Sequence, residues 1–219
     1  MGLGQLLHHN SEPGTAGLTM DHGGGYEVFA ALLFGGHRGR VYRRLVELSG
    51  TRAGDRVLDV GCGTGYLTRQ LAEIAEVGSV VGVDPSTRVI ARAARLNKNP
   101  NCSYVVGVAE SLGAEGDSFD VVASCLMLHH LPENLRSTAL GEMLRVLRPG
   151  GRLLIGEFRP PENAMGLHLI GALVSPLMQH NPIDLLEPMV ADAGFEQVRS
   201  GDLHPWIRYV SAVKPVSAR

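Results

Sequence analysis

The sequence predicts a doubly wound α/β domain, in which helices cover both faces of a mostly parallel β-sheet. One observation is that apolar β-branched runs alternate along the chain with segments of helical periodicity, as in consecutive βαβ units. A second is that these runs are apolar on both faces, as the strands of a covered parallel sheet must be. With 219 residues and 44% hydrophobic side chains, the chain suits one domain with a sizeable core.

The first fifty residues, 1–50, are expected to form an arm and helices that cap the site. Residues 1–20 are rich in Gly, Ser, Pro and His; an apolar helix is predicted at 26–34 and a basic amphipathic helix at 38–49. The arginines of the second helix lie mostly outside its apolar face. We expect them to meet solvent, unless one contacts an anionic substrate or a lipid surface. They are Arg38, Arg40, Arg43 and Arg44.

Residues 51–219 carry the alternation of strands and helices. Strands are predicted at 56–60, 79–83, 102–106, 119–124 and 151–158. Helices are predicted at 64–77, 86–97 and 134–147.

The rhythm changes after residue 158. An apolar insertion at about 160–180 includes 165–179, which contains no Asp, Glu, Lys or Arg. A helix near 182–194 follows and ends at Gly194. Two final strands, near 195–201 and 206–213, complete a seven-stranded sheet as an antiparallel pair at its edge.

The segment from Asp59 to Gly65, with sequence DVGCGTG, carries the strongest functional signal. It predicts a buried strand, a tight glycine turn and then the start of a helix. Free amides in the first turn of that helix and the positive end of the helix dipole favour an anionic ligand group. The three glycines allow the backbone to approach a ligand closely.

A second signal is Asp84, which ends the next apolar strand and lies 23 positions after Gly61. An acidic residue about 20 residues after such a turn hydrogen-bonds ribose hydroxyls, so a nucleoside cofactor is expected. A dinucleotide fingerprint requires a small residue at position 66, where this chain has Tyr66. The spacing therefore counts against a dinucleotide and favours another nucleoside cofactor.

These motifs resemble those of class I methyltransferases that depend on S-adenosylmethionine (SAM). The resemblance implies a Rossmann-like fold, SAM as cofactor and S-adenosylhomocysteine as product. The matching segments are 59–65, 82–86, 118–122 and 147–154. The segments 157–160 and 193–195 further resemble the ubiquinone/menaquinone C-methyltransferase group, also called methyltransferase type 11.

The resemblance assigns most cofactor contacts to the ends of strands. Asp59 is expected to orient the glycine turn or to face the cofactor amine, and Thr64 to reach the cofactor or to cap the helix. Asp84 is expected to bind the ribose. The complete set is Asp59, Gly61, Cys62, Gly63, Thr64, Gly65, Asp84, Pro85, Ser86, Val108, Ala109, Glu110, Ser124 and Leu126.

The adenine is expected beside Val108, Ala109 and Glu110. Members of the family often have an Asp where this chain has Val108, so that side-chain hydrogen bond is absent here. The amide of Ala109 and apolar packing by Val108 are the alternatives. Glu110 either replaces the missing acceptor or is solvated.

His129 and Glu157 are the candidate catalytic residues. Both follow strands, at the edge of the sheet where ligands of open α/β folds bind. A histidine needs only a small pKa shift to act as a general base near neutral pH. The alternative for His129 is a structural role in the pocket wall. Glu157 is expected to accept a substrate proton or to bind an acceptor amine.

The apolar segments at 26–34 and 165–179 favour a small hydrophobic methyl acceptor enclosed between them. A quinone precursor, an aromatic natural product and a lipid headgroup are the classes considered. The segment 165–179 alternatively packs on the sheet or on a second copy, which leaves a homodimer open. A different class of function is a SAM-binding regulatory or scaffold protein without methyl transfer.

Composition excludes several other classes. The net charge of −2 gives no support for a nucleic-acid partner, and no His, Cys or acidic cluster has metal-ligand spacing. Neither a signal peptide nor an apolar span of about 20 residues is present, although peripheral membrane contact stays open. The three cysteines form no Cys-x-x-Cys pair, and reduced thiols in a cytoplasmic protein are expected.

Overall fold

The computed structural model describes residues 8–9, 19–20, 34, 36–74, 78–159, 161, 181 and 183–216. The predicted apolar helix at 26–34, except for Phe34, and the apolar segment 165–179 lie outside the described residues. In the N-terminal arm, the short strands β1 (His8–His9) and β2 (Thr19–Met20) pair in antiparallel fashion.

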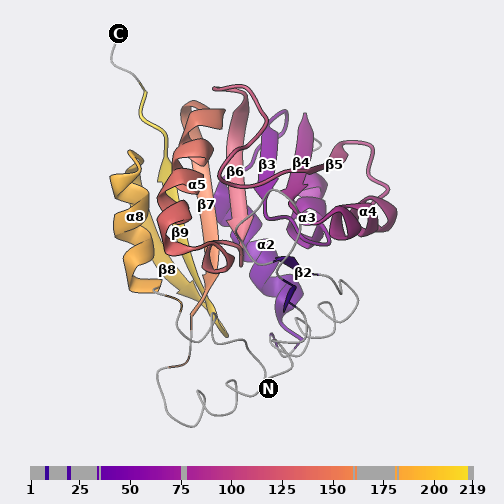
Figure 1. The fold of residues 1–219 in the computed structure, drawn as a ribbon, viewed down its shortest axis with the longest axis horizontal. Helices are drawn as coiled ribbons and strands as arrows, with labels where there is room; N and C mark the ends of the chain where they lie inside the picture. Colours follow the sequence, from indigo (N-terminus) through magenta and orange to yellow (C-terminus); the bar gives the residue numbers. More distant parts are fainter. Residues whose placement is uncertain are drawn as a thin grey trace.

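A seven-stranded sheet forms the centre of the molecule, with the order β5-β4-β3-β6-β7-β9-β8 (Figure 1). Strands β3 to β7 pair in parallel, and β9 pairs in antiparallel fashion with both β7 and β8. This arrangement confirms the predicted fold class. The strands are β3 (Arg56–Val60), β4 (Ser79–Asp84), β5 (Cys102–Val106), β6 (Phe119–Cys125), β7 (Leu147–Phe158), β8 (Glu196–Leu203) and β9 (Ile207–Val213).

The helices lie close to their predicted positions. They are α2 (Arg38–Ser49), α3 (Tyr66–Ile74), α4 (Thr87–Leu96), α5 (Glu133–Val146) and α8 (Leu186–Asp192), with 3-10 turns at Leu128–His130 and Ile183–Leu185. No helix within the described ranges is long and apolar enough to cross a membrane.

Two of the boundaries that differ from the prediction have a clear local reason. Helix α3 begins at Tyr66 rather than at 64, because Gly65 has a φ of +76°, which is incompatible with a right-handed helix. Strand β7 begins at Leu147, four residues early, because Leu147 already pairs with Phe119 of β6 before the strand continues through a bulge.

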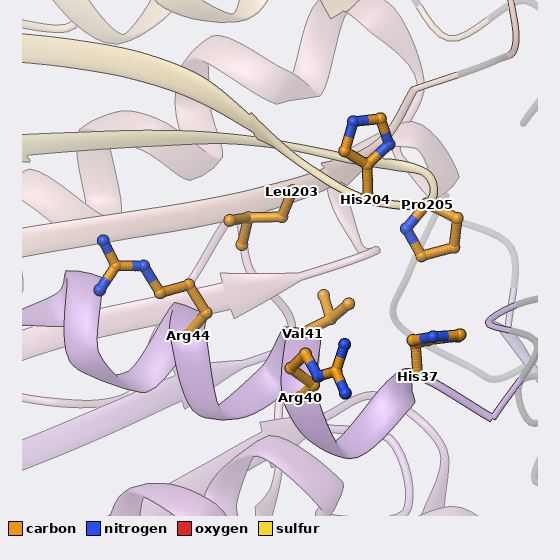
Figure 2. A pocket seen from close by; sticks show the side chains of 7 residues that line it. All are labelled: His37, Arg40, Val41, Arg44, Leu203, His204 and Pro205. Carbon is orange, nitrogen blue, oxygen red and sulfur yellow. The ribbon is translucent and has the colours of Figure 1, made fainter.

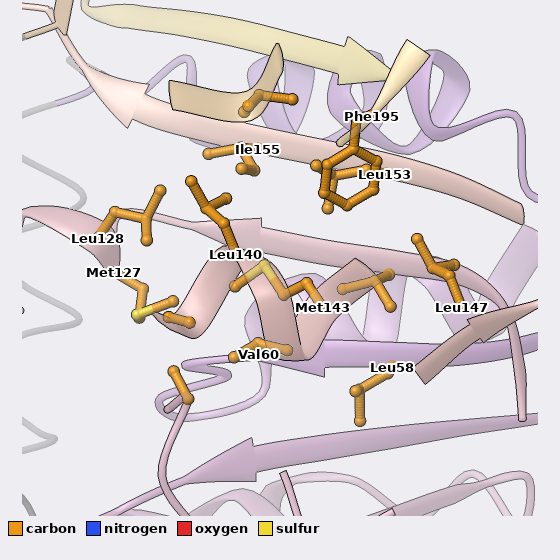
Figure 3. Close-up of a cluster of buried hydrophobic side chains, with 14 of the residues drawn as sticks. Leu58, Val60, Met127, Leu128, Leu140, Met143, Leu147, Leu153, Ile155 and Phe195 are labelled. Carbon is orange, nitrogen blue, oxygen red and sulfur yellow. The ribbon is translucent and has the colours of Figure 1, made fainter. Parts of the chain in front are cut away.

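Side chains of the central strands alternate between two apolar cores, one on each face of the sheet. Along β7, Leu153 and Ile155 pack with α5 and α8, whereas Leu154 packs with α2 and α3. Figure 3 shows the first of these cores, in which Leu140 and Met143 of α5 lie against the sheet. All five of these side chains are at most 1% exposed, so this part of β7 is covered on both faces.

The strand order places a topological switch point between β3 and β6. From β3 the chain builds outward through β4 to β5, then returns to place β6 on the other side of β3. Ligands of open α/β sheets bind at the carboxyl ends of the strands at such a point. The loops after Val60 and Cys125 are therefore the expected position of a site.

Candidate active site

The loop after β3 is a compact turn whose own amides donate hydrogen bonds to acceptors of the protein. The amides of Gly61 and Cys62 both donate to the carbonyl of Val83, at 2.8 and 2.9 Å. That of Gly63 donates to the Asp84 carboxylate at 3.0 Å, and that of Gly65 to the Cys62 carbonyl at 2.9 Å. These four amides are therefore already used by protein acceptors, and the free amides expected in the first turn of the following helix stay a prediction. The turn instead presents a surface for close approach.

Two of the glycines in this turn face different surroundings. Gly61 has a φ of +73°, and a Cβ atom there would lie 2.2 Å from Cγ of Met127. Gly63 has a φ of +53°, and a Cβ there would have no atom of the described structure within 4 Å. Gly61 is thus required by internal packing, whereas Gly63 borders open space.

Asp84 lies at the end of β4 and braces the neighbouring loops. Its Oδ2 accepts the amide of Gly63 and its Oδ1 accepts the amide of Ser86, both at 3.0 Å. Ser86 is fully buried and caps α4, because its Oγ accepts the amide of Val89. A carboxylate has about four acceptor sites, so Asp84 retains capacity for further donors such as ribose hydroxyls.

Asp59 is completely buried beneath the glycine turn. Its Oδ2 accepts the hydroxyl of Thr68 at 2.6 Å, and its Oδ1 has no hydrogen-bond partner among the described residues. Burial raises the pKa of Asp59 to about 7, against a smaller lowering by the Thr68 hydrogen bond. A buried carboxylate oxygen without a partner is a position where a cationic ligand group would be stabilised.

A small cavity of about 30 Å³ lies beside Asp59. This volume suits a group of the size of an ammonium or one water molecule rather than a whole nucleoside. The cavity is therefore the inner end of a site and does not enclose a complete cofactor. Its lining is Arg38, Tyr42, Asp59, Gly61, Cys62, Gly63, Thr64, Tyr66, Leu67, Cys125 and Leu126.

Arg38 corrects the expectation that the arginines of α2 meet solvent. It is only 7% exposed, and its guanidinium carbon lies 3.8 Å from the ring centroid of Tyr66 and 5.4 Å from that of Tyr42. Stacking on two aromatic faces allows a buried guanidinium to keep its charge. A cation and the Asp59 carboxylate thus border one cavity, which suits the ammonium and carboxylate of an amino acid.

Five residues of the cavity lining are not among the site residues predicted from the sequence: Arg38, Tyr42, Tyr66, Leu67 and Cys125. Arg38 and Tyr42 are four positions apart, so they share one helix face. That spacing was the available signal, but it identifies a site only when the packing of α2 against α3 is known.

The loop after β6 forms the opposite wall at the switch point. The hydroxyl of Ser124 donates to the carbonyl of Val60 at 2.9 Å and so joins β6 to β3. Leu126 has a φ of +57°, which is uncommon for a side chain of its size and occurs where a site constrains the backbone. Burial raises the pKa of Cys125 to about 12 and that of Cys62 well above its ordinary value, so both thiols are protonated at neutral pH.

The expected adenine loop lies beside Asp84. The amide of Gly107 donates to the carbonyl of Asp84 at 3.2 Å, and Val108 forms an isolated bridge with Ser111. Ala109 is buried in the core, while Oε2 of Glu110 is buried without a hydrogen-bond partner among the described residues. The Glu110 carboxylate therefore has an unused acceptor atom, and its role toward the adenine stays a prediction.

His129 and Glu157 form a buried pair outside the cavity lining. Nδ1 of His129 lies 2.6 Å from Oε2 of Glu157. Oε1 of Glu157 accepts the amides of Met127 and Leu128, at 3.0 and 2.7 Å, and Asn181 donates to Oε2 at 3.2 Å. Burial raises the pKa of Glu157, but the attraction of His129 and these hydrogen bonds outweigh it and lower the pKa below the ordinary value.

Within the described residues, the structure brings most of the predicted cofactor residues to one place. Asp59, Gly61, Cys62, Gly63, Thr64 and Leu126 share the cavity, and Asp84 and Ser86 adjoin it through the hydrogen bonds above. No group of three or more His, Cys, Asp or Glu side chains that could hold a metal ion occurs in the described part of the chain.

A glycine turn at the switch point, an acidic residue ending the adjacent strand and a charged inner cavity define an α/β protein that binds a nucleoside cofactor. Residues 57–151 match the profile of a family described as a methyltransferase domain. The ubiquinone/menaquinone biosynthesis C-methyltransferase UbiE of Ectopseudomonas mendocina is 35% identical, and the match covers 79% of this chain and 77% of that relative.

Solved structures show the same fold. A SAM-dependent methyltransferase from Aquifex aeolicus is similar with a TM-score of 0.70 and 20% identity, over 86% of this chain and 97% of that one. Phosphoethanolamine N-methyltransferase 2 of Haemonchus contortus, in complex with SAM, is similar with a TM-score of 0.63 and 20% identity, over 82% of this chain and 53% of that one.

The chain belongs to the class I SAM-dependent methyltransferase family and, within it, to the group that resembles UbiE. It is accordingly a SAM-dependent methyltransferase. The residues present fit the cofactor: the unpartnered oxygen of Asp59 and the guanidinium of Arg38 suit its amino-acid end, and the open space beside Gly63 admits it to the turn.

Proposed function

We propose that this protein transfers the methyl group of SAM to a ring carbon of a small hydrophobic acceptor, of the quinone-precursor type. The observation that carries the proposal is the 35% identity to a C-methyltransferase named for ubiquinone and menaquinone biosynthesis, over 77% of the length of that relative. The apolar character of the sequence at 26–34 and 165–179 supports a hydrophobic acceptor, although the structural roles of these segments stay predictions.

Within this proposal, the reduced form of the acceptor is the reactive one. A hydroquinone ring carries electron-donating oxygens and has a nucleophilic carbon, whereas the oxidised quinone does not. When bound, SAM supplies a methyl group that its sulfonium charge already activates. The protein must then hold the ring carbon in line with that methyl and exclude water, and such positioning can contribute about 7–11 kcal/mol.

Methylation of a ring carbon releases one proton, and His129 is the proposed acceptor of that proton. Its Nδ1 faces Glu157, so the imidazole carries its hydrogen there and leaves Nε2 as the basic nitrogen. Both oxygens of Glu157 are engaged by protein donors. We therefore propose Glu157 as a positioning residue for His129, in place of the expected contact with substrate.

Turnover with defined acceptors tests the proposal. Purified protein with SAM is offered a prenylated naphthohydroquinone, a prenylated benzohydroquinone and phosphoethanolamine, and S-adenosylhomocysteine is measured together with the product mass. We expect a methylated carbon on one of the hydroquinones and no methylation of the amine. Amine methylation without hydroquinone turnover would contradict the proposal.

Three further predictions concern the cap over the acceptor, the oligomeric state and the location of the protein. The cap over the acceptor is tested by Leu169→Asp and Leu173→Asp, which should abolish turnover of a hydrophobic acceptor while SAM still binds; melting curves check that the variants fold. A homodimer and a cytoplasmic location stay predictions, to be checked by sedimentation and by fractionation of cells.

A further inference from the structure

A second pocket, of about 480 Å³, lies between the outer face of α2 and the hairpin that joins β8 to β9. Figure 2 shows Arg40 and Arg44 on α2, with His204 and Pro205 across from them on the hairpin. This volume is within the range of small-molecule sites, which span roughly 300–1,000 Å³. The pocket lining is His37, Arg40, Val41, Arg44, Leu203, His204 and Pro205.

Helix α2 separates this pocket from the cofactor cavity. Residues 37, 40, 41 and 44 recur at intervals of three and four, so they share one face of the helix. Arg38 and Tyr42 lie on an adjacent face and line the cofactor cavity. The two linings have no residue in common, so the second pocket is a site of its own.

The charges around the second pocket are unbalanced. Its lining has two arginines, two histidines and no acidic residue, and the first turn of α2 contains no acidic residue either. Among the nearby carboxylates, Glu47 pairs with Arg44 at 2.7 Å. Asp202, which also attracts His204, is held by Arg159 and Arg208. The described structure shows no carboxylate against Arg40, so no ion pair among the described residues balances the charge of this lining residue.

The rest of the lining is apolar. Val41, Leu203 and Pro205 form walls beside the arginines, and Val41 is continuous with the core beneath α2. A purely ionic ligand would leave these walls against water, whereas a ligand with an apolar body would cover them. Arginine forks match the oxygens of a phosphate group in geometry and charge.

We propose that this pocket binds an amphiphilic phosphate, with its phosphate group between Arg40, Arg44 and His204 and its apolar part against Val41 and Leu203. Two sources share this chemistry: the headgroup of an anionic membrane lipid and a free phosphate ester with an apolar chain. The proposal does not depend on the identity of the methyl acceptor, because the pocket is separate from the cofactor cavity.

Equilibrium binding with two probes tests the proposal. The soluble probe is geranyl phosphate below its aggregation concentration, and the membrane probe is a set of phosphatidylcholine vesicles with and without phosphatidic acid. Arg40→Ala/Arg44→Ala is compared with Arg43→Ala/Arg88→Ala. The second variant removes the same charge from exposed helix positions that do not line the pocket. Binding of S-adenosylhomocysteine and a melting curve confirm that each variant is folded.

We expect the first variant to lose at least about tenfold in affinity for one of the probes, since it lacks two charge-assisted contacts. The control variant should bind like the wild type. A loss with geranyl phosphate assigns a soluble ester, and a loss with phosphatidic acid vesicles alone assigns a lipid headgroup. Equal losses in both variants would show attraction to net charge only and overturn the proposal. Absence of binding to either probe would also overturn it.

The apolar half of the proposal has its own measurement. Leu203→Ala should weaken geranyl phosphate binding while leaving the weak binding of inorganic phosphate unchanged. If inorganic phosphate binds the wild type as tightly as geranyl phosphate does, the amphiphilic character of the ligand is refuted.

Discussion

Nδ1 of His129 lies 2.6 Å from Oε2 of Glu157, and neither side chain is more than 2% exposed. Glu157→Gln removes the negative charge. It also replaces one acceptor oxygen by an NH2 group, which would face groups that themselves donate hydrogen bonds. Because breaking a buried pair leaves its partners unsatisfied, we expect a loss of about 3–5 kcal/mol in the free energy of unfolding. Urea unfolding measures this loss.

Kinetics of the same variant separate positioning from simple support of the fold. If Glu157 positions His129 as a general base, Glu157→Gln should change the pH profile of kcat, and His129→Ala should abolish the acid limb of that profile, because a general base is inactive when protonated. Both measurements are made below the unfolding temperature of each variant. Normal pH profiles in folded variants would restrict the pair to a structural role.

Acid should remove the stabilisation that this pair provides. The pKa of Glu157 is lowered from its ordinary value of 4.5, so its ionised form is favoured in the folded state. Its contribution is therefore fully present above pH 4.5 and is lost as the pH falls through the lower, folded pKa. We expect the stability difference between wild type and Glu157→Gln to shrink below pH 4.5. A difference that grows in acid would contradict the assignment.

The effect of Asp59 on the free energy of unfolding has the opposite pH dependence. Its pKa rises from 3.8 to about 7, so the folded state keeps a proton that the unfolded chain has lost between these values. Stability should thus fall as the pH rises from about 4 to 7, by roughly 4 kcal/mol at 1.36 kcal/mol for each pKa unit. Asp59→Asn should abolish this fall and be the more stable protein at pH 8, as measured by urea unfolding across the pH range.

The sequence predicted the sheet and the cofactor loops because their signals are local. The turn at 61–65 and the carboxylate of Asp84 are encoded by spacing along one segment, and the strand pattern fixes which edge of the sheet they share. Arg38 was misplaced because its burial depends on Tyr42 and Tyr66, which stack on it only when α2 packs on α3. The hydrogen bonds from the turn amides to Val83 and Asp84 could not be predicted from the sequence either, because they join residues of neighbouring strands and loops.

Asp59 and Asp84 should affect different ends of the cofactor. Asp84→Ala removes a ribose acceptor and should weaken both S-adenosylhomocysteine and 5′-methylthioadenosine by about ten- to a hundredfold, since each charge-assisted hydrogen bond contributes about 1.5–3 kcal/mol. Asp59→Asn should weaken only S-adenosylhomocysteine, because 5′-methylthioadenosine lacks the ammonium. Calorimetry with both ligands measures the pattern, and equal losses in both variants would exclude separate roles.

The glycine turn provides a matched pair of substitutions, Gly61→Ala and Gly63→Ala. Both positions have positive φ, so each variant should lose about 1–2 kcal/mol from backbone strain alone. At Gly61 the new methyl would also meet Met127 at 2.2 Å, and overpacking of this kind adds about 1–3 kcal/mol. At Gly63 the methyl has no neighbour within 4 Å and would instead fill space at the cofactor site.

The two variants should therefore separate stability from binding. We expect Gly61→Ala to show the larger fall in melting temperature. Gly63→Ala should lose more affinity for S-adenosylhomocysteine relative to the stability that it loses. Met127→Ala in the Gly61→Ala background should recover part of the stability, because it removes the clashing side-chain atoms. If Gly63→Ala binds the cofactor as tightly as the wild type, the cofactor does not contact this side of the turn.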